Sequence, residues 1–162
     1  AGLDYVTENG LSYSENLIGA GKDNKSTFKT LKAAIAQVLS NDEGSCVAIA
    51  NEVGTAKIAN PFSDGDISYV ESPYSYNSIT DFLDNIRSIR NVWFGSTNGS
   101  AASNSFNGFF ASVNQANVNT NVVNAFNTAI SNIGSMPAPF VKYCSTIWGI
   151  EFVDDEDWNV EE

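Results

Sequence analysis

The residues that could do chemistry are most concentrated in the segment 71–95. At 100° per residue, four short polar side chains of this segment fall on one edge of a helix: Ser78, Asp81, Asn85 and Ser88. An ordinary surface helix carries Lys and Glu at such positions. The pattern fits two interpretations. One is an ordinary packed helix with a partly solvated edge, and the other is a boundary that meets a cleft or another protein surface.

The sequence has no histidine, which excludes the commonest complete active sites. A Ser-His-Asp or Cys-His mechanism, a HExxH zinc site and a His-ligated iron all require an imidazole. Cys46 and Cys144 are too far apart in the sequence for a CxxC redox or zinc pattern. They could form one disulfide in an oxidising compartment, although Cys46 reads equally as a small buried hydrophobe. We predict no catalytic residue in this chain.

Length and charge restrict the class of partner. The chain has 162 residues, which suffice for one domain with a buried core. Its formal charge of −11 argues against nucleic acid and against anionic lipid as partners. No apolar run reaches the roughly 18 residues that span a bilayer. Because the chain begins with Ala1 and its single methionine is Met136, we expect a processed or excised segment.

Apolar residues recur at helical spacing through most of the chain. The clearest helix is expected at 78–94, with a capping box at Ser78 and Asp81 and the apolar stripe Ile79, Phe82, Ile86, Ile89 and Trp93. Other helices are expected at about 5–18, from 24 or 26 to about 57 with a kink or break at 41–44, near 106–113, and at 122–133 after a break at 114–121. Useful β-alternation is absent. The patterns predict an all-α antiparallel helix bundle.

Three charged features read most simply as solvated or local structure. Asp64-Gly65-Asp66, within a connecting segment at 58–75, lacks the spacing of an EF-hand loop and predicts a turn. Lys22, Lys25, Lys29 and Lys32 predict a solvated face or a contact with an acidic partner. Residues 148–162 predict an acidic tail or the end of a fragment.

Several short motifs occur in an order that resembles one known family. They are Asn51-Glu52-Val53-Gly54, Lys57-Ile58, Pro61, Glu71-Ser72-Pro73-Tyr74-Ser75, Asn77-Ser78, Asp81, Asn85-Ile86-Arg87-Ser88-Ile89, Asn91-Val92, Gly95 and Pro139-Phe140. Together they resemble the C-terminal half of an imelysin-like protein. The match covers roughly residues 10–143 and is most specific over 51–95.

The resemblance implies an all-α architecture of two related helical bundles, of which residues 1–147 would be one. It implies an exported protein, periplasmic or outer-membrane-associated and often a lipoprotein, that is linked to bacterial iron uptake and carries a peptidase label. The family's GxHxxE motif, proposed to bind metal, lies in the N-terminal bundle. This chain has no His and departs from the pattern there. We expect it to be the second half of a longer protein; a divergent member that has lost the site is the alternative.

The resemblance also assigns a cleft-facing role to Glu71, Ser72, Tyr74, Ser75, Asn77, Ser78, Asp81, Asn85 and Arg87. Asp81 and Glu71 would be the carboxylates that ligate a metal, iron or another, or that orient a neighbouring His. Without a third anchor they make a weak site, so any metal would be shared with the missing bundle. Glu52 and Lys57 form a second polar set and could pair with each other or with the cleft.

Three functions follow as expectations. The first is a non-catalytic binding module that supplies one wall of an inter-bundle cleft, with the N-terminal bundle and iron-uptake components as partners. The second is half of a metal-dependent peptidase whose GxHxxE site lies in the N-terminal bundle. In the third, the polar edge is only a domain-packing surface.

Overall fold

The computed structural model describes residues 4–41, 43–65 and 67–144. These residues form helices and no strand, apart from one isolated antiparallel bridge between Val6 and Ser12. The predicted all-α class is confirmed. The chain divides after Ala48 into two compact units, which are described separately below. The predicted acidic tail at 148–162 lies outside the described residues.

Side-chain caps set the helix starts in the first unit. Helix α1 covers Tyr13–Ile18 and begins with a capping box, in which Ser12 and Glu15 each accept a hydrogen bond from the other's backbone N–H. Helix α2 covers Leu31–Leu39 and is capped by Thr30. The expected starts at residue 5 and at 24 or 26 are therefore wrong, because the chain before each cap is a hydrogen-bonded turn.

A fully buried asparagine organises these turns. Oδ1 of Asn16 accepts hydrogen bonds from Nδ2 of Asn9 at 2.7 Å and from the backbone N–H of Thr27 at 2.8 Å. Its Nδ2 donates to the carbonyl of Ser12 at 2.9 Å and to Oγ1 of Thr7 at 3.1 Å. One side chain thus connects the segments on both sides of α1, and all its polar atoms are satisfied.

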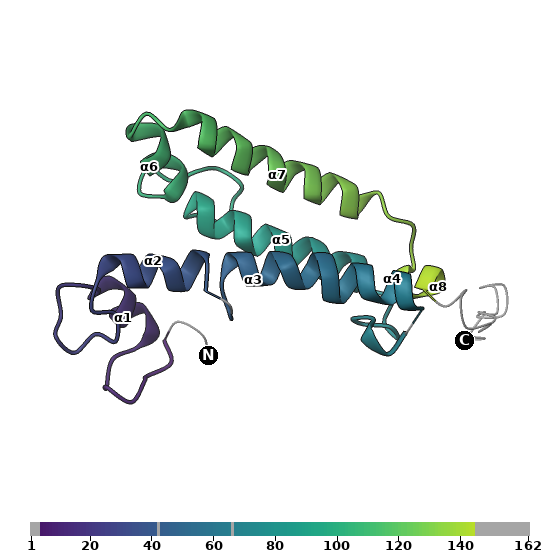
Figure 1. The fold of residues 1–162 in the computed structure, drawn as a ribbon, viewed down its shortest axis with the longest axis horizontal. Helices are drawn as coiled ribbons and strands as arrows, with labels where there is room; N and C mark the ends of the chain where they lie inside the picture. Colours follow the sequence, from purple (N-terminus) through teal and green to yellow (C-terminus); the bar gives the residue numbers. More distant parts are fainter. Residues whose placement is uncertain (1–3, 42, 66, 145–162) are drawn as a thin grey trace, which may run out of the picture. The chain divides into compact units, whose positions relative to one another are not determined.

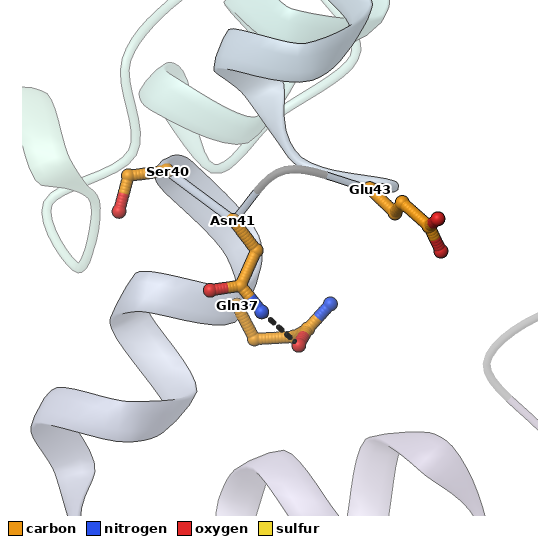
Figure 2. Close-up of a pocket in the computed structure, with 4 residues that line it drawn as sticks. All are labelled: Gln37, Ser40, Asn41 and Glu43. Carbon is orange, nitrogen blue, oxygen red and sulfur yellow. Dashed lines mark hydrogen bonds between the residues drawn. The ribbon is translucent and has the colours of Figure 1, made fainter.

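The break predicted at 41–44 is confirmed. Helix α3 (Cys46–Asn51) starts anew after Ser45, whose Oγ accepts from the N–H of Ala48. Between α2 and α3 the surface forms an open polar depression lined by Gln37, Ser40, Asn41 and Glu43, in which Asn41 donates to Gln37 at 2.5 Å (Figure 2). It contains none of the predicted site residues.

The helix that the sequence predicts to end near 57 continues into the first part of the predicted connecting segment, 58–75. α3 continues without a gap into a π-helix, η1 (Glu52–Ala59), and then into α4 (Asn60–Asp64). Gly65, with φ of +65°, ends α4 in the left-handed conformation, as a glycine can without strain. The turn predicted around Gly65 is confirmed there. A short 3₁₀ helix, η2 (Ile67–Tyr69), follows.

The central helix α5 (Ser78–Phe94) agrees with its predicted range. Its apolar stripe is confirmed, since four of its members are buried: Phe82, Ile86, Ile89 and Trp93. The predicted capping box is wrong. Asn77 occupies the cap position, no side chain caps the helix, and Oγ of Ser78 instead donates to the backbone carbonyl of Glu71.

Three more helices complete the second unit: α6 (Phe106–Ser112), α7 (Ala116–Gly134) and α8 (Phe140–Cys144). α7 runs back alongside α5 in the opposite direction (Figure 1). The break predicted at 114–121 is present but shorter, since α7 already begins at Ala116. A short turn suffices because Asn114 has φ of +58°, a conformation that asparagine tolerates better than most residues. None of the described helices combines the length and the apolarity needed to cross a bilayer.

Aromatic rings join α5 to its neighbours at both ends. Phe82 packs edge-to-face on Phe140 of α8, with ring centroids 5.3 Å apart. The Trp93 ring stacks with Phe106 and Phe110 of α6 at 5.8 and 5.2 Å, and its Nε1 donates to Oδ1 of Asn119 on α7 at 2.9 Å. The Phe82–Phe140 contact lies beside the start of α5 and the Trp93 contacts lie at its end, so the core fixes the helix at both ends.

Both cysteines are free thiols in the structure. Cys46 is half-buried and Cys144 is buried. Burial raises the pKa of the Cys144 thiol to about 11. Since the thiolate is the reactive form, Cys144 is a packing residue at neutral pH.

Candidate functional site

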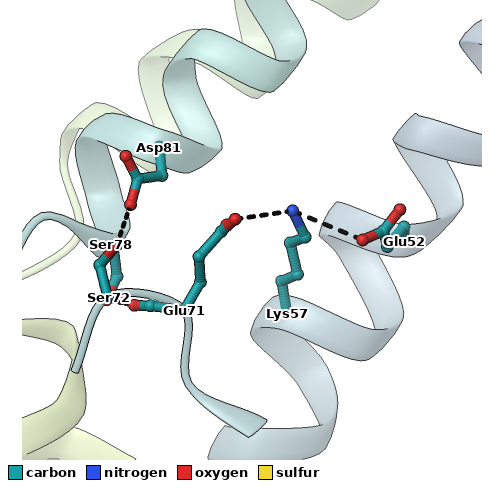
Figure 3. Close-up of polar contacts among 6 residues, drawn as sticks. All are labelled: Glu52, Lys57, Glu71, Ser72, Ser78 and Asp81. Atoms are coloured by element: carbon teal, nitrogen blue, oxygen red, sulfur yellow. Dashed lines mark hydrogen bonds and ion pairs between the residues drawn. The ribbon is translucent and has the colours of Figure 1, made fainter.

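Two hydroxyl groups hold the loop 71–77 on the first turn of α5. Oγ of Ser78 donates to the carbonyl of Glu71, and Oγ of Ser72 donates to Oδ2 of Asp81 at 2.5 Å (Figure 3). Ser72 itself has φ of +54°, in the sparsely populated left-handed region. A non-glycine residue in this conformation is held there by its surroundings, here by the bond to Asp81.

Lys57 links this loop to the π-helix. Its Nζ lies 3.0 Å from Oε1 of Glu71 and 3.5 Å from Oε1 of Glu52 (Figure 3). The predicted pairing of Glu52 with Lys57 is confirmed, and Lys57 also reaches Glu71. The ammonium group thus stands between two carboxylates from different elements.

The winding of η1 is what places Glu52 and Lys57 together. In an α-helix of about 3.6 residues per turn, residues five apart point about 140° away from each other. In a π-helix the backbone hydrogen bond joins residues i and i+5, so these two residues lie one above the other. The five-residue spacing of Glu52 and Lys57 was the only sequence signal for this arrangement.

The two carboxylates of Glu52 and Glu71 favour the charged form of Lys57. Desolvation by burial lowers its pKa, but the hydrogen bond to Glu71 and the charges of Glu71 and Glu52 outweigh this, so the pKa is raised from its ordinary value. The second oxygen of Glu71, Oε2, is buried and has no hydrogen-bond partner among the described residues. A buried carboxylate oxygen without a donor is costly.

The structure brings together four of the nine predicted site residues: Glu71, Ser72, Ser78 and Asp81. Ser78 is 1% exposed, so its contribution is to hold the loop. Asn85 is half-buried one turn beyond Asp81, whereas Ser75 and Asn77 are exposed and Tyr74 is 96% exposed at the tip of the loop. Arg87 is exposed and pairs with Asp84 at 2.9 Å, so it takes no part in this network.

The two predicted metal-binding carboxylates turn to different partners. Figure 3 shows Glu71 extending toward Lys57 and Asp81 facing Ser72. Nowhere in the described ranges do three or more His, Cys, Asp or Glu side chains come together to hold a metal ion. Glu71 and Asp81 thus have no third such ligand beside them among the described residues. A metal bound here needs further ligands, and it must compete with Lys57 for Glu71.

Replacing Lys57 with methionine is expected to lower the free energy of unfolding at neutral pH by about 1–3 kcal/mol, because the half-buried Glu71 carboxylate loses its donor. A folded-state pKa above the unfolded value stabilises the fold below the unfolded pKa, and this contribution is lost as pH rises through the folded pKa. The difference between wild type and K57M should therefore shrink above about pH 10.5. Urea titrations at several pH values measure it. A difference that grows with alkaline pH would contradict the ion pair.

Comparisons with known proteins give a family match and a similar solved structure. Residues 6–152 match the model of a family described as Imelysin and labelled a peptidase. The structure is similar to a crystal structure from Parabacteroides distasonis described as an iron-regulated protein A precursor, with 26% sequence identity and a TM-score of 0.74. The similarity covers 86% of this chain and 42% of that one, so this chain spans less than half of its neighbour's length. No curated protein matches the sequence.

Proposed function

The chain belongs to the imelysin family, and from this premise we propose that it is the non-catalytic half of an exported, iron-uptake-associated protein, supplying one wall of a cleft between two bundles. Residues 1–147 would be the C-terminal bundle, with the acidic segment 148–162 beyond it. The short coverage of the neighbour supports a second domain, and that neighbour's description as an iron-regulated precursor supports iron and export. We place the protein in the periplasm or at the outer membrane, with any lipid anchor outside this chain.

One observation carries the proposed site. Oε2 of Glu71 is buried without a hydrogen-bond donor, beside an ion pair and one loop away from the Asp81 carboxylate. A donor or a cation supplied from outside this chain would satisfy it. The exposed residues Tyr74, Ser75 and Asn77, together with Asn85 and Arg87, would line the rest of the wall.

Metal is the ligand that the carboxylates favour, as part of a shared shell. Carboxylate oxygens suit hard cations, and Glu71 and Asp81 would each give one ligand while the N-terminal bundle gives the others. Such a metal would supply further positive charge beside the two carboxylates. This chain's own residues orient the carboxylates: Ser72 holds Asp81, and Lys57 holds Glu71 until a stronger cation replaces it.

The second candidate is half of a metal-dependent peptidase. The family's peptidase label favours it. Because this chain has no His, its general base and metal-binding imidazole would have to come from the GxHxxE motif of the N-terminal bundle.

Metal binding by the combined halves separates these functions. The chain is produced together with an imelysin N-terminal bundle, and ferric ion and zinc are titrated by calorimetry. We expect E71A and D81A each to weaken binding by about 10–100-fold. D84A is the matched control, since Asp84 is an exposed carboxylate on the same helix that pairs with Arg87.

The outcomes are distinct. Metal binding that depends on Glu71 and Asp81, without peptide cleavage, supports the binding module. Cleavage of a peptide library that both variants abolish supports the peptidase. Unchanged binding and no cleavage leave only a packing surface and refute the proposed site.

A further inference from the structure

Asparagine followed by glycine is a pair whose side-chain amide can be lost without an enzyme. The backbone nitrogen of the glycine attacks the side-chain carbonyl carbon of the asparagine, and the missing Cβ of glycine leaves that nitrogen unshielded. The sequence contains three such pairs: Asn9-Gly10, Asn98-Gly99 and Asn107-Gly108. The structure distinguishes these pairs by the hydrogen bonds that hold their reacting groups.

The first pair is held at both reacting groups. The attacking group would be the N–H of Gly10, which donates to the carbonyl of Thr7 at 2.9 Å. The leaving group would be Nδ2 of Asn9, which donates to Oδ1 of Asn16 and to the carbonyl of Lys25, each at 2.7 Å. All three hydrogen bonds must break before this pair can react, so the turn around it must first open.

The third pair is held in the same way inside helix α6. The N–H of Gly108 donates to Oγ of Ser105 at 3.0 Å, and Nδ2 of Asn107 donates to Oδ1 of Asn119 at 2.9 Å. The open side of Gly108 also lies against the backbone carbonyl oxygen of Ser103, which leaves no room for the backbone to turn toward the side chain. This pair, too, reacts only after local unfolding.

Asn98 and Gly99 differ from the other two pairs because both of their reacting groups are free. They lie exposed in the loop that joins α5 to α6. Within the described chain, no group accepts a hydrogen bond from the N–H of Gly99 or from Nδ2 of Asn98. The position that a Cβ would occupy on Gly99 has open space around it to 4 Å. The nucleophile and the leaving group can therefore react without any opening of the fold.

The carbonyl oxygen of the Asn98 side chain, in contrast, is held by two donors. Its Oδ1 accepts from the backbone N–H of Ser100 at 2.9 Å and from Oγ of Ser96 at 2.6 Å. The first of these bonds is an Asx turn, which keeps the side chain folded back on its own backbone. When a nitrogen attacks the carbonyl carbon, this oxygen becomes negatively charged, and donors already aimed at it stabilise that charge.

We propose that Asn98 is a site of spontaneous deamidation, activated by the two hydrogen bonds to its Oδ1. The nitrogen of Gly99 gives up its proton and bonds to Cγ of Asn98, the bond from Cγ to Nδ2 breaks, and Nδ2 leaves with a proton as ammonia. One water then opens the cyclic imide at either carbonyl, which leaves aspartate or isoaspartate at this position. The product places a negative charge in the segment 91–141, whose sequence has no Asp, Glu, Lys or Arg. The proposal does not depend on the binding site at the start of α5.

Incubation of the folded 162-residue chain at mildly alkaline pH, followed by peptide mass spectrometry, measures conversion at each of the three pairs. We expect Asn98 to convert faster than Asn9 or Asn107 by about tenfold or more, because only those two require local opening. The rate at Asn98 should rise with pH, since the attacking nitrogen must lose its proton. In urea the advantage of Asn98 should disappear. Equal rates at the three pairs in the folded chain, or an advantage that persists in urea, would overturn the proposal.

A pair of serine variants tests the activation. S96A removes one donor to Oδ1 of Asn98 and should slow its conversion by about threefold or more. S100A is the matched control and should convert as wild type does, because Ser100 donates through its backbone N–H, which alanine keeps. Slow conversion of Asn9 and Asn107 in the same samples shows that each variant is folded. An S96A chain that converts Asn98 as fast as wild type would overturn the activation by hydrogen bonding.

Discussion

Replacing Phe82 with alanine is expected to lower the free energy of unfolding by about 3–5 kcal/mol. Phe82 is 0% exposed, and its ring packs edge-to-face on Phe140. Truncation would remove this aromatic contact and leave a cavity between α5 and α8, which the surrounding backbone can close only in part. The effect should be among the largest of any single change in the second unit.

Chemical denaturation followed by far-ultraviolet circular dichroism measures this loss. V92A is the matched control, because Val92 lies on the same helix but is 38% exposed, and it should cost well under about 1 kcal/mol. If F82A cost no more than V92A, the packing of α8 on the start of α5 would be wrong. The candidate site would then lose its support, since Phe82 directly follows Asp81.

Replacing Asn16 with leucine is expected to destabilise the first unit by about 2–5 kcal/mol. Leucine is similar in size but can neither accept from Asn9 and Thr27 nor donate to Ser12. The cost comes from the donors and acceptors left without partners, since each such buried group costs about 1–3 kcal/mol.

Amide hydrogen exchange resolves this effect to the first unit. The N–H of Thr27, which donates to Asn16 in the wild type, should exchange much faster in N16L, while the amides of α5 stay protected. N24A is the control, because Asn24 is an exposed residue of the same unit. Equal protection of Thr27 in N16L and wild type would show that the buried network does not hold these turns.

The sequence predicts best where one physical rule acts alone. The 3.6-residue period identifies the buried stripe of α5 and places the end of the 122–133 helix within one residue of the observed end of α7 at Gly134. Helix starts fail where tertiary hydrogen bonds compete with local signals. Ser78 has the chemistry of a cap, but its hydroxyl is used by the carbonyl of Glu71, seven residues earlier.

The candidate site divides in the same way. The resemblance to imelysin-like proteins assigned the carboxylates and hydroxyls at the start of α5 to one site. The structure does connect two of these residues, since Ser72 donates a hydrogen bond to Asp81. The sequence predicted that Lys57 pairs with Glu52 or with the cleft, but not that it does both. The contact with Glu52 depends on π-helical winding, which a 3.6-residue pattern does not represent. Arg87 takes no part in the hydrogen bonds around Glu71 and Asp81, because it pairs with Asp84, three residues earlier on the exposed side of α5.

The composition of α7 has a consequence for the order in which the chain folds. Six asparagines and no charged pairs give this segment little tendency to form a helix on its own. We therefore expect α7 to become helical only when it docks against α5. α5 precedes α7 in the sequence and is therefore synthesised first. α5 can act as a template on which α7 forms. A chain truncated after α5 would lose α7, the helix that depends on this contact, and would keep α5.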